Sequence, residues 1–425
     1  MIQILGGDCR EVLKGLPDAS VHCVVTSPPY WGLRDYGTAV WEGGDAGCKH
    51  QGPPVRTQAG FNARYFGKEF ASDKQGDECE PMGQFCKCGA RRIDSQLGLE
   101  SSPTAYVEQM VAVFREVHRV LRDDGTLWLN MGDSYATAPN GRAAADIVND
   151  DRTFRDKPFS TVGHGLKAKD LCGIPWRIAF ALQSDGWYLR QDIIWSKPNP
   201  MPESVTDRCT KAHEYIFLLS KSARYYYDAD AIKETAEYGY SSTPQMFNGV
   251  GTAISSPKRK IGAVQQGSGG TRNKRSVWEI ATAPFSEAHF ATFPPALIEP
   301  CILAGCPEKA CAKCGAPWVR ETRCEYVDKG KGIIGGKKGC DPSNGWSGYP
   351  SVSKRVETLG FSPSCSCNAE IAPGTVLDPF FGAGTTGLVA DRLGRDCIGI
   401  ELNPAYADMA KRRVQDDAGM FAEVL

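Results

Sequence analysis

The stretch 376–401 constrains the fold of this chain more than any other part of its sequence. An apolar strand ends at Asp378, a Gly-x-Gly-x-x-Gly turn begins at Gly382, a helix follows, and a second apolar strand ends at Glu401. Glycines let the backbone approach a ligand closely, and an acid after the second strand can accept hydrogen bonds from ribose hydroxyls. The pattern therefore predicts an α/β protein with a nucleoside-cofactor site.

The residues inside this turn distinguish between two kinds of nucleoside cofactor. A dinucleotide places its pyrophosphate at the helix N-terminus, where the helix dipole favours negative charge. Here the turn instead carries a carboxylate, Asp378, and two bulky aromatic residues, Phe380 and Phe381. That combination favours a cofactor with a cationic amino-acid moiety.

A stiff polar loop, Ser27-Pro28-Pro29-Tyr30, follows another apolar run at 21–25. Its two prolines fix their own φ angles and keep the preceding residue out of helical space, so the loop cannot become a helix. With Trp31 it presents carbonyl oxygens, one hydroxyl and two aromatic faces, a set that suits a flat ring bearing an amino group. Two interpretations of Trp31 are open, packing behind the loop and direct contact with that ring.

Together the two motifs resemble those of the DNA amino-methyltransferases, which transfer a methyl group from S-adenosylmethionine to an exocyclic amine. The loop 27–30 precedes the cofactor turn, as in the permuted beta class of that family. The resemblance implies an α/β fold with a permuted Rossmann-like methyltransferase sheet and helices on both faces. It implies a catalytic motif made of Ser27, Pro28, Pro29 and Tyr30. The cofactor-binding residues that it implies are Asp8, Thr292, Phe293, Pro294, Asp378, Phe380, Gly382, Gly384, Thr385 and Glu401.

The implied mechanism requires the target nucleotide to leave the duplex or to be bound as a single strand. Tyr30 would stack on the base, while the Ser27 hydroxyl and the Pro28 carbonyl would accept hydrogen bonds from its amine. In this family, serine at the first motif position goes mostly with cytosine, and aspartate or asparagine mostly with adenine. The sequence thus predicts a cytosine-N4 methyltransferase of DNA, with an adenine-N6 enzyme as the alternative. More remote alternatives are an RNA methyltransferase and a zinc-containing module that only binds nucleic acid.

Further segments are similar to the same family. Gly7-Asp8-Cys9-Arg10, ahead of the first predicted strand, looks like the segment whose acid contacts the cofactor adenine. The stretch 120–130 predicts a helix end, a turn and a strand, and two more strands are predicted at 192–195 and 215–219. The stretch 289–297 resembles the motif that closes over the methionine portion of the cofactor.

Cysteine spacing predicts two zinc sites in insertions. The chain has 17 cysteines, and a reducing compartment would keep them as thiols. The predicted ligands of one site are Cys311, Cys314, Cys365 and Cys367, with Cys306, Cys324 and Cys340 as alternatives. Those of the other are Cys48, His50, Cys86 and Cys88, with Cys79 as a competitor, unless these are unrelated surface cysteines. Neither site is predicted to be catalytic, because four protein ligands leave no open position.

The segment 241–276 is poor in apolar residues and rich in glycine, serine, lysine and arginine. Its composition alone is typical of a solvated loop without regular structure. Its position, however, matches that of the family's target-recognition region, where basic side chains hold phosphates. The predicted DNA-binding residues are Lys258, Arg259, Lys260, Arg272, Lys274 and Arg275.

Overall composition limits the classes of function and location. The formal net charge of −1 excludes a globally basic nucleic-acid footprint, so DNA contact depends on local clusters. No apolar stretch reaches the ~18 residues of a membrane span, and no signal peptide is predicted at the start. The expected protein is cytoplasmic, encoded by a bacterium or a phage, and acts on double-stranded DNA. It would bind S-adenosylmethionine and one or two structural zinc ions, and a cognate restriction endonuclease is a candidate partner.

The predicted organisation is one methyltransferase domain with insertions. Its catalytic-motif part is 1–41, its central sheet is 96–228, and its cofactor-binding part is 284–305 with 368–425. The insertions are a zinc-binding segment at 42–95, a target-recognition region at 229–283 and a zinc ribbon at 306–367.

Overall fold

A large central sheet dominates the computed structural model, which describes residues 1–33, 36, 38–45, 47–48, 86, 88–137, 161–235, 271–283, 292–328 and 352–418. In order across the sheet, its eight strands are β1 (Ile2–Gly6), β16 (Asp396–Glu401), β15 (Thr375–Asp378), β2 (Val21–Thr26), β5 (Leu121–Met131), β7 (His213–Ser220), β6 (Tyr188–Ser196) and β10 (Val277–Glu279). β7 runs antiparallel to both of its neighbours, while every other neighbouring pair in this sheet is parallel.

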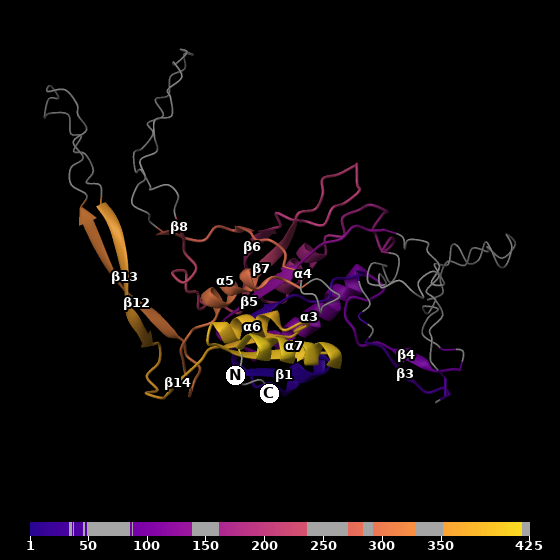
Figure 1. Ribbon diagram of the computed structural model, residues 1–425, viewed down its shortest axis with the longest axis horizontal. Helices are drawn as coiled ribbons and strands as arrows, with labels where there is room; N and C mark the ends of the chain where they lie inside the picture. The colour runs from indigo at the N-terminus through magenta and orange to yellow at the C-terminus, as the bar shows by residue number, and fades with distance from the viewer. Residues whose placement is uncertain are drawn as a thin grey trace, which may run out of the picture.

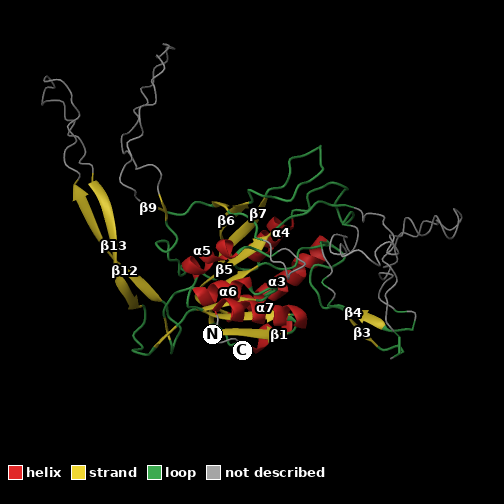
Figure 2. Ribbon diagram, viewed as in Figure 1, coloured by secondary structure: helices red, strands yellow, loops and turns green. Residues whose placement is uncertain are grey.

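Helices cover both faces of this sheet (Figures 1 and 2). Successive side chains of a strand point to opposite faces, so Val24 of β2 packs in one apolar layer while Cys23 and Val25 pack in the other. The first layer contains α1 (Cys9–Val12), α3 (Pro103–Val120) and α4 (Ile174–Ser184), and the second contains α5 (Pro295–Gly305), α6 (Thr385–Arg392) and α7 (Pro404–Ala418). The predicted α/β architecture is thereby confirmed.

The strands predicted at 192–195 and 215–219 are confirmed as β6 and β7, but the stretch 120–130 differs from its prediction. α3 ends at Val120 and β5 begins at Leu121, so no separate turn lies between the helix and the strand. The pairing of β2 with β5 instead shifts its register between Val21 and Cys23. The extra residues are accommodated inside the strand as an irregularity of the ladder.

The prediction that Gly7–Arg10 precedes the first strand is wrong. β1 comes before this segment and pairs in parallel with β16, from Ile2 opposite Cys397 to Gly6 opposite Glu401. This short edge strand combines a fully buried Ile2 with an exposed Gln3, and so lacks the continuous apolar run of the central strands. As a consequence, Asp8 follows a strand at the same edge of the sheet as Glu401.

Several smaller elements lie outside the central sheet. They are the 3-10 helix η1 (Leu13–Gly15) and the strand pairs β3 (Val40–Glu42) with β4 (Arg91–Ile93), β8 (Glu234–Thr235) with β9 (Thr271–Arg272), β11 (Ala310–Cys311) with β14 (Ile371–Ala372), and β12 (Trp318–Asp328) with β13 (Val352–Pro363). The β12–β13 hairpin projects away from the core, and the β3–β4 pair lies on the opposite side of the molecule (Figure 1). Among the helices of the described ranges, none has the length and apolar character that crossing a membrane requires.

Candidate active site

The carboxyl ends of the parallel strands bring together motifs from opposite ends of the chain. β2 pairs with β15, so the loop 27–30 leaves one strand while Asp378 ends its neighbour. Asp8 follows β1 and Glu401 ends β16, on the next two strands. Ligands of open α/β sheets bind outside the carboxyl ends of the strands, which makes this edge the candidate active site.

Asp378 ties the two motifs together from inside the protein. Its fully buried carboxylate accepts hydrogen bonds from Thr26 Oγ1 (2.5 Å), from Thr386 Oγ1 (2.7 Å) and from the backbone N–H of Phe380 (3.0 Å). Burial raises the pKa of Asp378 to about 6. The side chain thus acts on the site by joining the end of β2 to the first turn of α6.

Glycines and one aromatic ring shape the turn between β15 and α6. Gly382 and Gly384 have φ angles of 53° and 73°, which glycine adopts without steric cost. Phe381 is buried, and its ring packs against two further glycines. A Cβ atom added to Gly399 would lie 2.4 Å from this ring, and one added to Gly387 would lie 2.6 Å from it. Only glycine at these two positions leaves room for the ring, so β16 and α6 pack closely around the turn.

Glu401 closes the turn from the neighbouring strand. Its Oε2 accepts the backbone N–H of Gly382 (2.7 Å), and its Oε1 accepts that of Asn403 (2.8 Å). Burial raises the pKa of Glu401, although these backbone hydrogen bonds act in the opposite direction. Because each carboxylate oxygen has a second lone pair, Glu401 retains the capacity to accept a ligand hydroxyl. Nearby in the chain, Phe380 is half-buried and Thr385 is buried at the start of α6.

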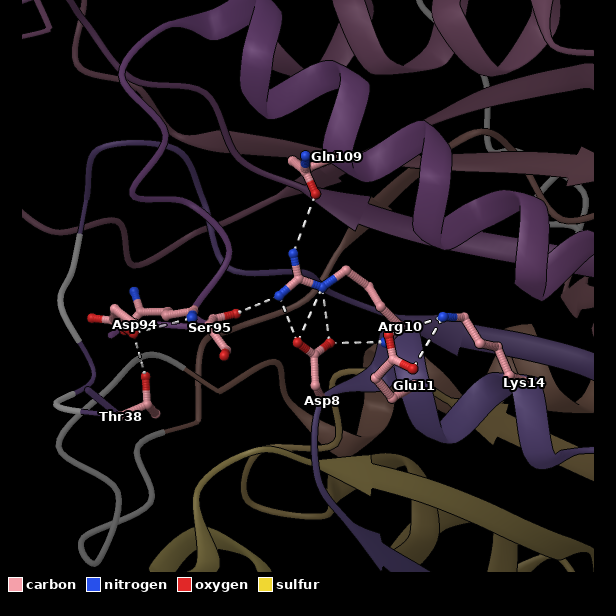
Figure 3. A network of polar contacts seen from close by, with 9 residues as sticks. Asp8, Arg10, Glu11, Lys14, Thr38, Asp94, Ser95 and Gln109 are labelled. Atoms are coloured by element: carbon pink, nitrogen blue, oxygen red, sulfur yellow. Dashed lines mark hydrogen bonds and ion pairs between the residues drawn. The ribbon is translucent and has the colours of Figure 1, made fainter. Parts of the chain in front are cut away.

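Asp8 forms a forked ion pair with Arg10 (Figure 3). Arg10 Nε and Nη2 donate to the carboxylate at 2.5 to 3.1 Å, and the Arg10 backbone N–H adds a bond of 2.9 Å. Burial alone would raise the pKa of Asp8, but the contacts with Arg10 outweigh it and hold the pKa below its usual value. Arg10 also donates to the Ser95 carbonyl (3.1 Å) and to Gln109 Oε1 (3.2 Å), which joins the loop after β1 to α3. The adenine contact of Asp8 stays a prediction.

Buried neighbours hold the loop 27–30 in place. The hydroxyl of Tyr106 on α3 donates to the Pro29 carbonyl (2.7 Å), and Trp31 Nε1 donates to the Glu100 carbonyl (2.9 Å). Trp31 is only 2% exposed and belongs to the first apolar layer. Of its two open interpretations, packing behind the loop is therefore confirmed.

Tyr30 joins the loop to a polar group that the sequence analysis missed. Its hydroxyl donates to Glu214 Oε2 (2.8 Å) and lies 3.4 Å from both Ser27 Oγ and Asn130 Oδ1. Lys197 Nζ forms an ion pair with the same Glu214. Burial, and then the Glu214 carboxylate, raise the pKa of Tyr30 well above its ordinary value, so this hydroxyl keeps its proton.

Strand direction explains why Glu214 was missed. In parallel strands the functional side chains follow the strand, but β7 is antiparallel, so its first residues lie at the edge where its neighbours end. A carboxylate at the start of an apolar run, as in His213-Glu214, is the only local signal.

The four cysteines 311, 314, 365 and 367 lie together, with their sulfur atoms within 4.8 Å of one another. Backbone N–H groups of Cys314 and then Lys313 lower the pKa of Cys311 to about 7. The turn docks on the amino ends of the central strands, since the Cys314 carbonyl accepts from Arg122 (2.8 Å) and the Gly315 carbonyl contacts His22 Nε2 (2.8 Å). This cluster is thus at the opposite edge of the sheet from the candidate active site.

The remaining cysteine predictions have mixed outcomes. The sulfur atoms of Cys48, Cys86 and Cys88 also lie within 4.8 Å of one another. Cys306 is buried in the second apolar layer, so it is not an alternative ligand in this structure. His50, Cys79 and Cys340, and the side chain of Cys324, lie outside the described residues.

Arg272, Lys274 and Arg275, the predicted DNA-binding residues that the structure describes, lie beside β10 and make no recorded contact with the loop 27–30. Arg272 and Arg275 both pair through Nε with Glu234 Oε1, at 2.8 and 2.7 Å, and Lys274 Nζ lies 5.1 Å from the ring centroid of Trp278. Trp278 belongs to β10, at the far lateral edge of the sheet from β1. Lys258, Arg259 and Lys260 lie outside the described residues.

Thr292, Phe293 and Pro294 lead into α5. Pro294 occupies the N-cap position of this helix, and the partly buried Phe293 packs against the second apolar layer. Residues 289–291 of the predicted closing motif lie outside the described residues.

Known proteins resemble this chain over most of its length. The sequence matches a family described as DNA methylase (N6_N4_Mtase) over residues 21–311 and 366–412. The type II methyltransferase M.Cfr9I of Citrobacter freundii is 37% identical over 411 residues, which cover 97% of this chain and 87% of that protein. M.SmaI of Serratia marcescens, also a type II methyltransferase, is 36% identical over 412 residues, covering 97% and 90%. The solved structure of the cytosine-N4-specific Pvu II DNA methyltransferase aligns with 97% of this chain and 90% of that chain, at 14% identity and a TM-score of 0.46, too distant to bear on the target base.

Proposed function

The chain belongs to the family of N6- and N4-specific DNA methylases, and from this premise we propose that it methylates the N4 amine of a cytosine turned out of duplex DNA. The observation that carries the proposal is the meeting of the loop 27–30 with the turn 378–387 at the ends of two paired strands. Because M.Cfr9I and M.SmaI are type II methyltransferases, we extend the proposal to a restriction-modification role beside a cognate endonuclease.

The turn fits S-adenosylmethionine as the methyl donor. Gly382 and Gly384 give the turn the positive φ angles that let its backbone approach a ligand closely, and Glu401 has lone pairs available for ribose hydroxyls. When bound, this cofactor supplies an electrophilic methyl group on a cationic sulfonium. The residues assigned to it are Asp8 at the adenine, Thr292, Phe293 and Pro294 at the methionine portion, and Phe380, Gly382, Gly384, Thr385 and Glu401 around the turn. Asp378 supports that turn through its buried hydrogen bonds.

The loop 27–30 provides the groups for the target base. Ser27 Oγ and the Pro28 carbonyl accept the two hydrogens of the exocyclic amine, which directs the nitrogen lone pair toward the methyl donor. Tyr30 stacks on the base. Because Tyr106 and Trp31 fix the loop before substrate arrives, alignment requires little reorganisation during the reaction.

A hydroxyl at position 27 supports cytosine over adenine as the target. Both bases carry an exocyclic amine that Ser27 and Pro28 could hold, so the preference rests on the resemblance to cytosine-N4 enzymes with serine at this position. An adenine-N6 activity of the same site is the alternative outcome of product analysis.

DNA contact is assigned to the basic side chains beside β10. Arg272 and Arg275 use their Nε atoms for Glu234, and their terminal nitrogens, with the ammonium of Lys274, are the groups assigned to phosphates. Lys258, Arg259 and Lys260 stay predicted contacts from the sequence.

Transfer to DNA is testable with purified protein and methyl-labelled S-adenosylmethionine. We expect label in duplex DNA that contains the recognition sequence, and none in RNA of matching sequence. Genomic DNA from a host without the gene serves as substrate, because it contains the unmodified sites of any short recognition sequence. Label in RNA alone would favour the RNA methyltransferase alternative, and label in neither would contradict an enzymatic function.

The two cysteine clusters are assigned to structural zinc. Four thiolates at about 2.3 Å from a zinc ion lie about 3.8 Å apart, and sulfur atoms already within 4.8 Å of one another fit that geometry. Cys48, Cys86 and Cys88 provide three ligands of the second site, where His50 stays the predicted fourth. Zinc at these positions would fasten the two insertions to the core.

Metal analysis is expected to find about two zinc ions per chain, one for each closed four-ligand site. Cys314→Ser should lower the content by about one ion and lower the melting temperature, because metal binding is coupled to folding of the ligand loops. Cys209→Ser is the matched control, since Cys209 is exposed and belongs to neither cluster. A content well below one zinc per chain would contradict both sites.

A further inference from the structure

Glu214 lies in the candidate active site, but its carboxylate has no role in the methyl transfer proposed for the loop 27–30. Its side chain is only 17% exposed, and it pairs with Lys197, which is 18% exposed. Lys197 Nζ also lies 4.2 Å from the ring centroid of Trp195 on β6. Removing two charges from water is costly unless further hydrogen bonds compensate. The hydrogen bonds that Glu214 makes to its other neighbours therefore indicate what its carboxylate does in the site.

The backbone of Gly132 lets Glu214 and Tyr30 meet. A Cβ atom at position 132 would lie 2.7 Å from Tyr30 Cε2 and 3.2 Å from the Glu214 carboxyl carbon. Any side chain here would therefore displace the pair, and glycine allows the 2.8 Å bond between the Tyr30 hydroxyl and Glu214 Oε2. Asn130 Nδ2 donates to the Tyr215 carbonyl (3.1 Å) and lies 3.4 Å from Glu214 Oε2.

The carboxylate determines which way the hydrogen bonds run. An ionised carboxylate only accepts, so the Tyr30 hydroxyl donates to Glu214. The Tyr30 oxygen, to which the Gly132 backbone N–H also donates, then accepts from the Ser27 hydroxyl, which is placed to donate to it at 3.4 Å. This bond is long, and such bonds tighten in complexes with substrate. With its own hydrogen directed to Tyr30, the Ser27 hydroxyl keeps its two lone pairs as acceptors for a ligand.

We propose that Glu214 is a positioning residue, which fixes the hydrogen-bond direction from Ser27 through Tyr30 so that Ser27 meets the target amine as an acceptor. The inference rests on the proposed transfer to an exocyclic amine. Lys197 balances the charge of Glu214 by contacting Oε1, which leaves Oε2 to Tyr30. The chain of contacts thus runs from Lys197 through Glu214 and Tyr30 to Ser27.

A purely stabilising role of the ion pair between Lys197 and Glu214 predicts different effects of the same substitutions. Lys197 follows β6 and Glu214 lies in β7, so the pair could simply hold two adjacent strands together. In that case loss of the charge would lower stability, and its effect on the rate would be independent of the Tyr30 hydroxyl. Combining substitutions at positions 30 and 214 separates the two.

The experiment measures single-turnover methyl transfer to duplex DNA, at saturating S-adenosylmethionine, for Glu214→Gln, Tyr30→Phe and the double variant. The glutamine amide can donate to the Tyr30 oxygen and so reverse the hydrogen-bond direction. Each single variant is expected to lose roughly 10²-fold in rate, the lower limit of the range for one positioned polar group. Because both break the same chain of contacts, the double variant should be less than about twofold slower than the slower single one.

Cofactor affinity and control variants complete the test. The dissociation constant of S-adenosylmethionine should stay unchanged, since Glu214 acts on the base side of the site. Glu116→Gln, which removes the ion pair with Arg119 on α3, should keep the wild-type rate. A wild-type rate in Glu214→Gln, or single effects that multiply in the double variant, would overturn the proposal.

Two outcomes separate this inference from other causes of failure. If Glu214→Gln does not fold, the rate of Tyr30→Phe alone tests the proposal, because this variant keeps the ring and removes only the hydroxyl. A wild-type rate of methyl transfer in Tyr30→Phe would overturn the proposal. If the wild-type protein transfers no methyl group to DNA, the proposed function itself has failed, whatever the variants do.

Discussion

Ser27→Ala is expected to lower the rate constant of methyl transfer by roughly 10²–10³-fold, as for the removal of one preorganised polar group from a reaction site. The alanine lacks the oxygen that accepts an amine hydrogen, so the nitrogen lone pair is no longer directed toward the methyl donor. Single-turnover measurements with labelled cofactor report this rate directly. Cofactor affinity should stay near the wild-type value, because the residues of the turn 378–387 are unchanged.

The control for this substitution is Ser184→Ala. Ser184 is exposed at the end of α4, where its hydroxyl donates to the Phe180 carbonyl (2.9 Å). It tests the loss of a serine hydroxyl far from the loop and should keep the wild-type rate. A Ser27→Ala variant within a few fold of wild type would show that the hydroxyl does not hold the amine.

Asp378→Ala is expected to lower the free energy of unfolding by on the order of 3 kcal/mol, since three buried donors lose their acceptor. These are the hydroxyls of Thr26 and Thr386 and the backbone N–H of Phe380. Asp378→Asn keeps one acceptor oxygen and nearly the same volume, so it should be much more stable than Asp378→Ala. Urea unfolding of the two variants measures the difference, and equal stabilities would contradict the structural part assigned to the carboxylate.

The same carboxyl group makes a pH-dependent contribution. Its pKa is raised by burial from 3.8 to about 6, so between these values the folded protein binds more protons at this site than the unfolded chain does. The resulting penalty is fully present above pH 6 and is relieved as the pH falls toward 4. The pKa difference corresponds to about 3 kcal/mol, and Asp378→Asn should lack this component. Unfolding curves at pH 5 and pH 7.5 for both proteins isolate it.

Local sequence patterns predicted the motifs that form the candidate site, but not the contacts between these motifs and the rest of the fold. The strand ends at Thr26, Asp378 and Glu401 were predictable because each joins a continuous apolar run to a turn with a distinctive composition. The grouping of Cys311 with Cys365 was predictable from ligand spacing, although 54 residues separate them in the numbering. That the loop 27–30 and the turn 378–387 belong to one site came from the family resemblance. The pairing of β15 with β2, which brings them together, was not predicted, because strand order is a long-range property that neither segment encodes alone.

The features that the sequence did not predict depend on contacts between segments that are far apart in the chain. β1 was missed because an edge strand needs an apolar residue on only part of its surface, as in the alternation of Ile2 and Gln3. Glu214 was missed because the reversal of β7 places the start of a strand at the active edge. The enclosure of Asp378, with both oxygens used by the protein, also follows from packing between β2, β15 and α6 rather than from any motif.

Identification of the modified nucleoside tests the central claim most directly. Duplex DNA is incubated with the protein and S-adenosylmethionine, digested to nucleosides, and analysed by chromatography with mass spectrometry against authentic standards. We predict N4-methyldeoxycytidine as the single new nucleoside, and its absence when Ser27 is replaced by alanine over the same reaction time. N6-methyldeoxyadenosine as the only product, or no modified nucleoside in DNA, would contradict the assignment.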